Sequence, residues 1–188
     1  MLKSVTPTLN VFSITWNLGP RCNFSCSYCP PRLHSKTSPH KTLAQLQEIW
    51  ANIYNKTKHL QKQYKLSFTG GEVTINPDFL DFLDWLKTHY GDQIANMGFT
   101  TNGSASTQYY SQAIVLVDYI SFSSHFSQMK NTKFYNNVLK THVKAVKLKK
   151  NIFVNIMDED TPEIAELKQM CEKYRIPHAI NEIDWDWQ

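Results

Sequence analysis

The sequence predicts an α/β protein built on a parallel sheet, and three observations lead to that prediction. Short segments rich in β-branched and aromatic residues alternate with longer segments whose apolar residues recur at helical spacing. Each helical segment is long enough to return the chain across a sheet, so that successive strands pair in parallel. Polar turns follow several strands directly, at the edge where ligands gather in such folds.

Three strands and two helices are predicted in the first half of the chain. The strands cover residues 11–16, 64–69 and 94–100. Thr42 and Gln45 form a capping box at the start of the first helix. Its apolar stripe consists of Leu43, Leu46, Trp50 and Ile53. Asn76-Pro77 begins the second helix, whose inward residues are Phe79, Leu83 and Leu86.

Three further strands and three helices complete the predicted series. The strands cover residues 119–123, 152–156 and a short segment around 178–180. A helix is predicted over residues 107–117, and a Lys-rich helix follows with the apolar pattern Val138, His142, Ala145 and Val146. The last helix has Thr161 as its N-cap and Pro162 at its first position. Its apolar residues are Ile164, Leu167, Cys171 and Tyr174.

Length and charge limit the class of protein. The 188 residues fit one domain spanning 1–188. The sequence has neither a signal peptide nor the run of about 18 apolar residues that a membrane span needs, so we expect a cytoplasmic protein. The net charge of +4 gives no argument for nucleic acid. Residues 130–150 hold seven Lys and no acid, which favours a solvated helix face over a site for an anionic partner.

Three cysteines lie on one short loop after the first predicted strand. Cys22, Cys26 and Cys29 have Cys-x3-Cys-x2-Cys spacing, which suits three corners of a four-iron cluster. The local chain supplies no fourth Cys, so one iron would keep an open coordination site, where metals carry out chemistry. Residues 1–47 contain no Asp or Glu, which lowers the cost of holding an anionic cluster and of adding an electron to it.

Other readings of the cysteines remain open at this stage. A zinc-stabilised binding module would need His34 or His40 as a fourth ligand. A non-catalytic iron–sulfur electron carrier would need Cys171, which lies instead on the apolar stripe of the last predicted helix and is expected in the core. A disulfide framework has no support from the composition.

The cysteine spacing resembles the signature of the radical SAM superfamily, including the aromatic Tyr28 before the third Cys. Gly70-Gly71-Glu72, directly after a predicted strand, is similar to the Gly-Gly-Glu element of that family. The resemblance implies a partial TIM-type (β/α)6 barrel with parallel strands, whereas periodicity alone leaves a doubly wound sheet as the alternative. It also implies a [4Fe-4S] cluster that reductively cleaves S-adenosylmethionine (SAM). The resulting 5′-deoxyadenosyl radical would abstract hydrogen from a peptide or small-metabolite substrate, with a flavodoxin or ferredoxin as electron donor.

The resemblance also implies roles for residues at the strand ends. Gly70, Gly71 and Glu72 would bind the SAM amino group, and Asn102 belongs to a polar turn near it. Ser121 and Ser123 share one strand face and would meet the SAM ribose or carboxylate, or else cap the strand end. Asn155 lies where relatives pack the adenine. His125 is a candidate acid or base, or a surface loop residue. The tail 181–188 would plug the barrel, contact substrate, or mark where a longer protein was cut.

Overall fold

A single parallel sheet organises the protein. The computed structural model describes residues 10–183, so the predicted tail is described only to residue 183. Every neighbouring pair of strands is parallel, and the strand order follows the chain from β1 to β6. The strands are β1 (Val11–Asn17), β2 (Gln63–Thr69), β3 (Ile94–Thr101), β4 (Tyr119–Ser123), β5 (Asn151–Met157) and β6 (His178–Asn181).

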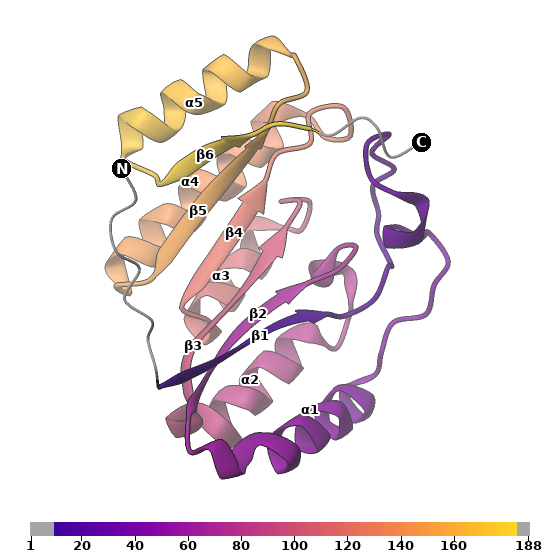
Figure 1. The fold of residues 1–188 in the computed structure, drawn as a ribbon. Helices are drawn as coiled ribbons and strands as arrows, with labels where there is room; N and C mark the ends of the chain where they lie inside the picture. The colour runs from indigo at the N-terminus through magenta and orange to yellow at the C-terminus, as the bar shows by residue number, and fades with distance from the viewer. Residues whose placement is uncertain (1–9, 184–188) are drawn as a thin grey trace, which may run out of the picture.

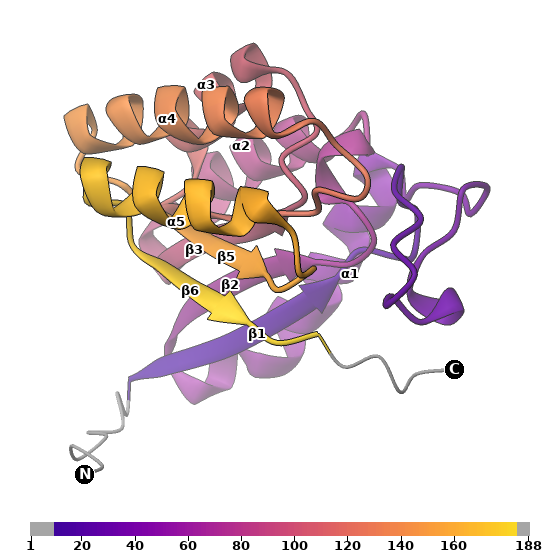
Figure 2. The same cartoon turned by 90° about the horizontal axis from the view of Figure 1, so that it is seen from above.

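Helices connect the successive strands and cover one face of the sheet (Figures 1 and 2). They are α1 (Leu43–Thr57), α2 (Phe79–Tyr90), α3 (Thr107–Leu116), α4 (Asn131–Lys147) and α5 (Pro162–Tyr174). The predicted capping box of α1 is present, with Thr42 and Gln45 each bonded to the other's backbone N–H. Within the described residues, no helix is both long and apolar enough to cross a bilayer.

The strand order separates the two folds that periodicity had left open. A doubly wound sheet reverses its strand order at a switch point, and its helices cover both faces. Here the order runs from β1 to β6 without reversal, and the helices lie on one face (Figure 2). The fold is therefore the predicted partial (β/α)6 barrel, left open between β1 and β6.

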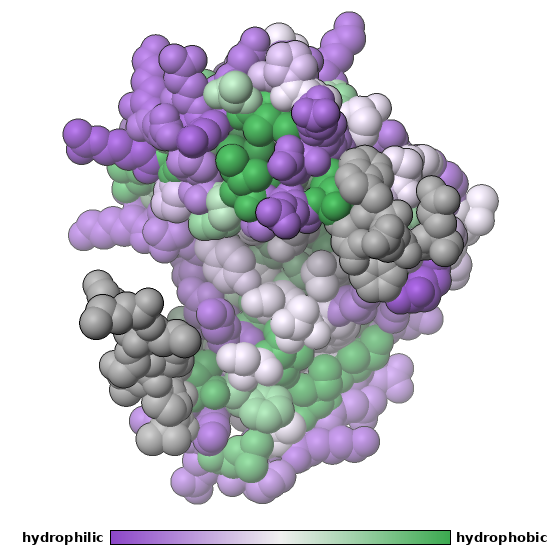
Figure 3. Space-filling model, turned by 45° about the horizontal axis from the view of Figure 1, so that its top comes forward, coloured by the Kyte–Doolittle hydropathy of each residue, from purple (hydrophilic) through white to green (hydrophobic). Residues whose placement is uncertain are grey.

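Residues alternate along each strand between an apolar core and a polar open face. Phe68, Phe99 and Phe122 are fully or almost fully buried toward the helices, while the intervening Ser67 and Ser121 are only half-buried. This confirms the prediction that Ser121 and Ser123 lie opposite Phe122. In Figure 3 the middle of the open face is pale, between greener areas above and below. The middle of the open side is thus of intermediate hydropathy, with apolar areas on both sides of it.

Two predicted helix stripes were partly wrong. Val146 was assigned to the apolar stripe of α4 but is 60% exposed. The buried face of α4 consists of Phe134, Asn137, Val138, Thr141 and Ala145. In α5, Tyr174 is exposed and Met170 takes its place in the core. Both helices carry two adjacent apolar rows, and packing against neighbouring elements decides which row is buried.

Asn137 joins α4 to the turn after β3 from inside the protein. Its Nδ2 donates to the carbonyl oxygens of Gly103 and Ala105, each at 2.9 Å, and its Oδ1 accepts from Thr107 Oγ1 at 2.7 Å. The side chain is 2% exposed. A buried amide with all these partners fixes the position of the turn that follows Thr101.

Replacing Asn137 by Leu should therefore destabilise the protein. The substitution keeps the volume but leaves two buried carbonyls and a hydroxyl without partners, so the free energy of unfolding should fall by about 2–4 kcal/mol. Urea denaturation of the metal-free protein measures this change. Asn136→Leu, on the exposed side of the same helix, is the matched control and should alter stability by less than about 0.5 kcal/mol. Equal effects of the two variants would contradict the prediction.

Candidate functional site

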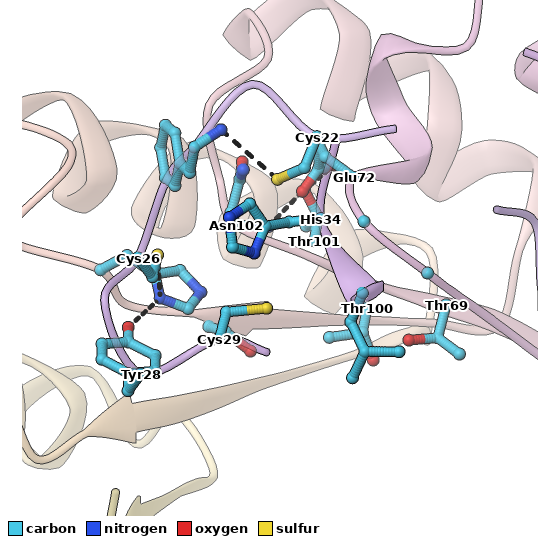
Figure 4. Close-up of a pocket in the computed structure, with 16 residues that line it drawn as sticks. Cys22, Cys26, Tyr28, Cys29, His34, Thr69, Glu72, Thr100, Thr101 and Asn102 are labelled. Atoms are coloured by element: carbon cyan, nitrogen blue, oxygen red, sulfur yellow. Dashed lines mark hydrogen bonds between the residues drawn. The ribbon is translucent and has the colours of Figure 1, made fainter. Parts of the chain in front are cut away.

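A cavity of about 270 Å³ lies at the carboxyl ends of the strands, beneath the cysteine loop (Figure 4). Ten residues singled out from the sequence line it: Cys22, Cys26, Tyr28, Cys29, Gly70, Gly71, Glu72, Asn102, Ser123 and His125. They come from the loop after β1 and from the ends of β2, β3 and β4. The topology therefore brings together segments that are far apart in the sequence, as the carboxyl edge of a parallel sheet does in general.

The three cysteines of the loop are free thiols in one cavity. Burial raises the pKa of Cys22 and Cys29, and raises the pKa of Cys26 to about 11. The thiols therefore hold their protons until a metal displaces them. The Phe24 backbone N–H points at Cys22 Sγ at 3.4 Å, a contact of the kind that supports a cluster thiolate. This donor set fits three corners of an iron–sulfur cluster.

The Gly-Gly-Glu turn lies directly against the base of the cysteine loop. Gly71 N donates to Gly19 O at 2.9 Å, and Glu72 N donates to Arg21 O at 2.8 Å. Gly70 has a φ of +139°, and a Cβ there would lie 2.6 Å from Gly19 O. A Cβ on Gly71 would lie 2.6 Å from Pro20 O. Only glycine permits this approach of two backbones, so the turn positions the residue before Cys22.

Glu72 is a buried carboxylate surrounded by protein donors. Its Oε1 accepts from Thr74 N at 3.0 Å, Thr74 Oγ1 at 2.6 Å and Thr101 Oγ1 at 2.7 Å. Its Oε2 accepts from Asn102 N at 2.6 Å. Burial raises the pKa of Glu72, and these donors act in the opposite direction. Since a carboxylate oxygen has two lone pairs, Oε2 retains room for one further donor from the cavity.

Asn102 ties the end of β3 to the cysteine loop. Its Nδ2 donates to Asn23 Oδ1 at 2.9 Å, and Asn23 in turn donates to Ser104 Oγ at 2.8 Å. Its backbone N–H holds Glu72, as described above. Asn102 therefore connects the carboxylate, the β3 turn and the loop between Cys22 and Cys26.

His125 forms a hydrogen-bonded chain at the other side of the cavity. Tyr28 Oη donates to Glu159 Oε1 at 2.8 Å and also contacts His125 Nδ1. Because the single Tyr28 proton goes to Glu159, His125 Nδ1 must be the donor in the second contact. The same Nδ1 lies 3.6 Å from Cys26 Sγ. His125 is thus assigned the Nδ1–H tautomer, and its Nε2 carries the lone pair.

Comparison with known proteins decides the family. The sequence profile described as the radical SAM superfamily matches residues 16–171, which run from the end of β1 through the cysteine loop into α5. The chain belongs to the radical SAM superfamily. This is an enzyme family, and its members include proteins named as a maturase and as cyclases.

Several radical SAM relatives are similar over part of their length. Mycofactocin maturase MftC of Mycobacterium tuberculosis is 25% identical over 107 residues, which are 57% of this chain and 25% of that protein. GTP 3′,8-cyclase of Campylobacter jejuni is 29% identical over 83 residues, which are 44% and 25% of the two chains. The crystal structure of Streptococcus suis SuiB bound to precursor peptide SuiA superposes with a TM-score of 0.68 at 15% identity, covering 92% of this chain and 39% of SuiB. The matched part of the chain thus corresponds to about a quarter of the length of these two curated relatives.

Family membership, together with the geometry, argues against the other readings of the cysteines. Cys171 is fully buried in the main core beside Leu167 and Met170, whereas Cys22 and Cys26 belong to a separate cluster. Cys171 is therefore a core residue, as its position on the helical stripe indicated. Across residues 10–183, no three His, Cys, Asp or Glu side chains come close enough to hold a single metal ion.

Two predicted site residues lie apart from the cavity wall, and several lining residues were not predicted. Asn155 Nδ2 donates to Ser121 Oγ at 2.7 Å, and the pair lies on the open face without lining the cavity. Their roles toward SAM stay predictions. Six further residues line the cavity, of which only His34 was a predicted candidate, as a zinc ligand: Phe24, Leu33, His34, Thr69, Thr100 and Thr101. Thr69, Thr100 and Thr101 end β2 and β3 at the same edge of the sheet as Glu72, so their place at the strand ends was the available signal.

Gly71→Ala should prevent cluster assembly. The added Cβ meets the backbone of Pro20 and Arg21, which cannot yield without moving Cys22. We expect iron bound per chain after anaerobic reconstitution to fall to the level of a Cys22→Ala variant. Gly91→Ala is the matched control, since a Cβ there meets nothing within 4 Å, and it should bind iron like the unmodified protein. Full iron loading of Gly71→Ala would contradict this account of the turn.

His125 should make the metal-free protein less stable in mild acid. Burial lowers the pKa of His125 from 6.5 to about 4, against a smaller opposing effect of the Glu159 charge. As the pH falls from 7 to 5, the unfolded chain takes up a proton that the folded chain excludes, so this group lowers the free energy of unfolding by about 2 kcal/mol. His125→Gln should remove this part of the pH dependence in urea denaturation, whereas exposed His59→Gln should keep it. An unchanged slope in His125→Gln would refute the assignment.

Proposed function

We propose that this protein is a radical SAM enzyme whose Cys22, Cys26 and Cys29 hold a [4Fe-4S] cluster with one iron open to SAM. The observation that carries the proposal is the cavity itself, where three free thiols without a fourth Cys face polar strand ends. Once bound, the cluster and SAM supply an electron and a 5′-deoxyadenosyl radical that abstracts hydrogen from substrate. We propose that residues 1–188 form a single radical SAM core domain and that the protein is cytoplasmic.

The residues of the chain would bind and orient SAM. The free lone pair of Glu72 Oε2 suits the methionine ammonium group, and the glycines beside it allow close approach. Ser123 and Asn102 lie on the cavity wall, where they offer polar groups to the carboxylate or ribose. Ser121 and Asn155 continue the polar open face beyond the cavity and are assigned to the ribose and adenine side.

Tyr28 and His125 would hold the cysteine loop in place over the cavity. Their rings stack with centroids 6.0 Å apart, and Glu159 anchors Tyr28 from the segment after β5. The His125 Nε2 lone pair is available to accept a hydrogen bond or a proton from substrate. We assign His125 as the candidate catalytic base on this ground.

A peptide is the substrate class that we favour, with a small metabolite as the alternative. The SuiB structure, similar in fold, is described as bound to a precursor peptide, and the matched cyclase is named for GTP. The open face carries uncharged amides and hydroxyls, such as the chain in which Asn181 Nδ2 donates to Asn155 Oδ1 at 3.0 Å. Such groups pair with peptide backbone. A flavodoxin or ferredoxin is the proposed electron donor.

SAM cleavage by anaerobically reconstituted protein tests this function. With dithionite and SAM, we expect 5′-deoxyadenosine to form in the unmodified protein and in Cys171→Ala, because Cys171 lies in the core. Cys26→Ala should form no more than the protein-free control. Iron loading without any SAM cleavage would show a non-catalytic cluster protein instead. Faster cleavage with added peptide than with added GTP would identify the substrate class.

A further inference from the structure

His34 occupies an anchored position beside the cysteine loop. It follows the short helical turn η1 (Pro31–Leu33) in extended conformation. The next residue, Ser35, bridges to Arg21; Ser35 N donates to Pro20 O at 2.7 Å, and Ser35 O accepts from Cys22 N at 2.9 Å. Two backbone hydrogen bonds therefore fix the His34 segment against the residue that carries the first thiol.

The His34 side chain points into the cavity of the three cysteines. It lines that cavity together with Cys22, Cys26 and Cys29, and Figure 4 shows its ring directed into the space between the cysteine side chains. His40, on the same loop, lies instead against a different and smaller hollow that includes Pro39 and Asn76. The two histidines of this loop thus have different surroundings.

His34 Nδ1 is a buried polar atom without a hydrogen-bond partner among the residues that the structure describes. An unpaired buried nitrogen costs free energy, and native proteins rarely retain one without a function or a bound partner. An imidazole nitrogen with a free lone pair is a good ligand for iron. Histidine also replaces cysteine on one iron of some iron–sulfur clusters.

We infer that His34 Nδ1 ligates the fourth iron before SAM binds, and that SAM displaces it. The inference rests on the proposed function, since it needs the three-cysteine cluster. The exchange breaks one iron–nitrogen bond and forms bonds from the iron to the carboxylate and the amino nitrogen of SAM. The amino group gives up one proton to solvent as it binds, and no electron is transferred. His34 would shield the open iron from solvent in the absence of SAM, and its departure would make SAM binding a prerequisite for chemistry.

Hyperfine spectroscopy of protein labelled with 15N-histidine tests the inference. The labelled protein is reconstituted anaerobically, reduced with dithionite and examined without SAM by electron spin echo modulation. We expect a 15N coupling to the reduced cluster that is lost in His34→Ala and lost when unlabelled SAM is added. His40→Ala is the matched control and should keep the coupling. His125→Gln should keep it as well, which excludes the imidazole near Cys26 as its source.

The dissociation constant for SAM provides a second test, because the inference predicts the direction in which it changes. If His34 competes with SAM for the iron, the Kd for SAM should fall in both His34→Ala and His34→Gln. A rise in that Kd would show that His34 contacts SAM itself and would overturn the inference. So would a cluster that cleaves SAM but shows no histidine coupling, an outcome that leaves the proposed function intact. Protein that takes up no cluster overturns both proposals.

Discussion

The contact between two stretches of backbone determines the geometry of the site. The pairing of β1 and β2 continues beyond the strands, through Leu18 N to Thr69 O, Gly71 N to Gly19 O and Glu72 N to Arg21 O. These backbone hydrogen bonds hold the start of the cysteine loop and the Gly-Gly-Glu turn in direct contact. Neither Gly70 nor Gly71 has room for a side chain there. The remaining contacts of the site are built on this junction.

The negative charge expected in the cavity beside this backbone contact favours a cationic ligand. Burial raises the pKa of Cys22, and the nearby Glu72 charge raises it further. Three thiolates on a cluster and a buried carboxylate would concentrate negative charge in one cavity. Residues 1–47 contain no Asp or Glu, and Lys36 donates to the backbone of Asn23 inside the loop, but Glu159 adds a carboxylate beside Tyr28. The positive sulfonium group of SAM would offset part of this negative charge.

Local pattern predicted the parallel α/β class and the centre of the site, and the family resemblance supplied the barrel, but neither predicted the contacts between distant loops. Strand alternation, the Thr42 capping box and the cysteine and glycine motifs are readable because each depends on neighbouring residues. Glu159 was not predicted as a site residue, yet it binds Tyr28 because the loops after β4 and β5 converge with the cysteine loop. His34 and His40 were equivalent by spacing. In the structure the bridge between Arg21 and Ser35 holds His34 beside the cysteine cavity, whereas His40 lines a different hollow.

The order of the strands in the sheet has a consequence for how the protein is made. Each strand pairs with the one synthesised just before it, so the sheet can grow from its N-terminal edge as the chain leaves the ribosome. The lining of the cavity runs from Cys22 to His125. The whole lining therefore precedes β5 and β6 in the chain, while Glu159, which secures Tyr28, follows β5. The residues that form the cavity and the residue that fixes the cysteine loop thus come from separate parts of the chain, so a change after β5 can loosen the loop without altering any cysteine.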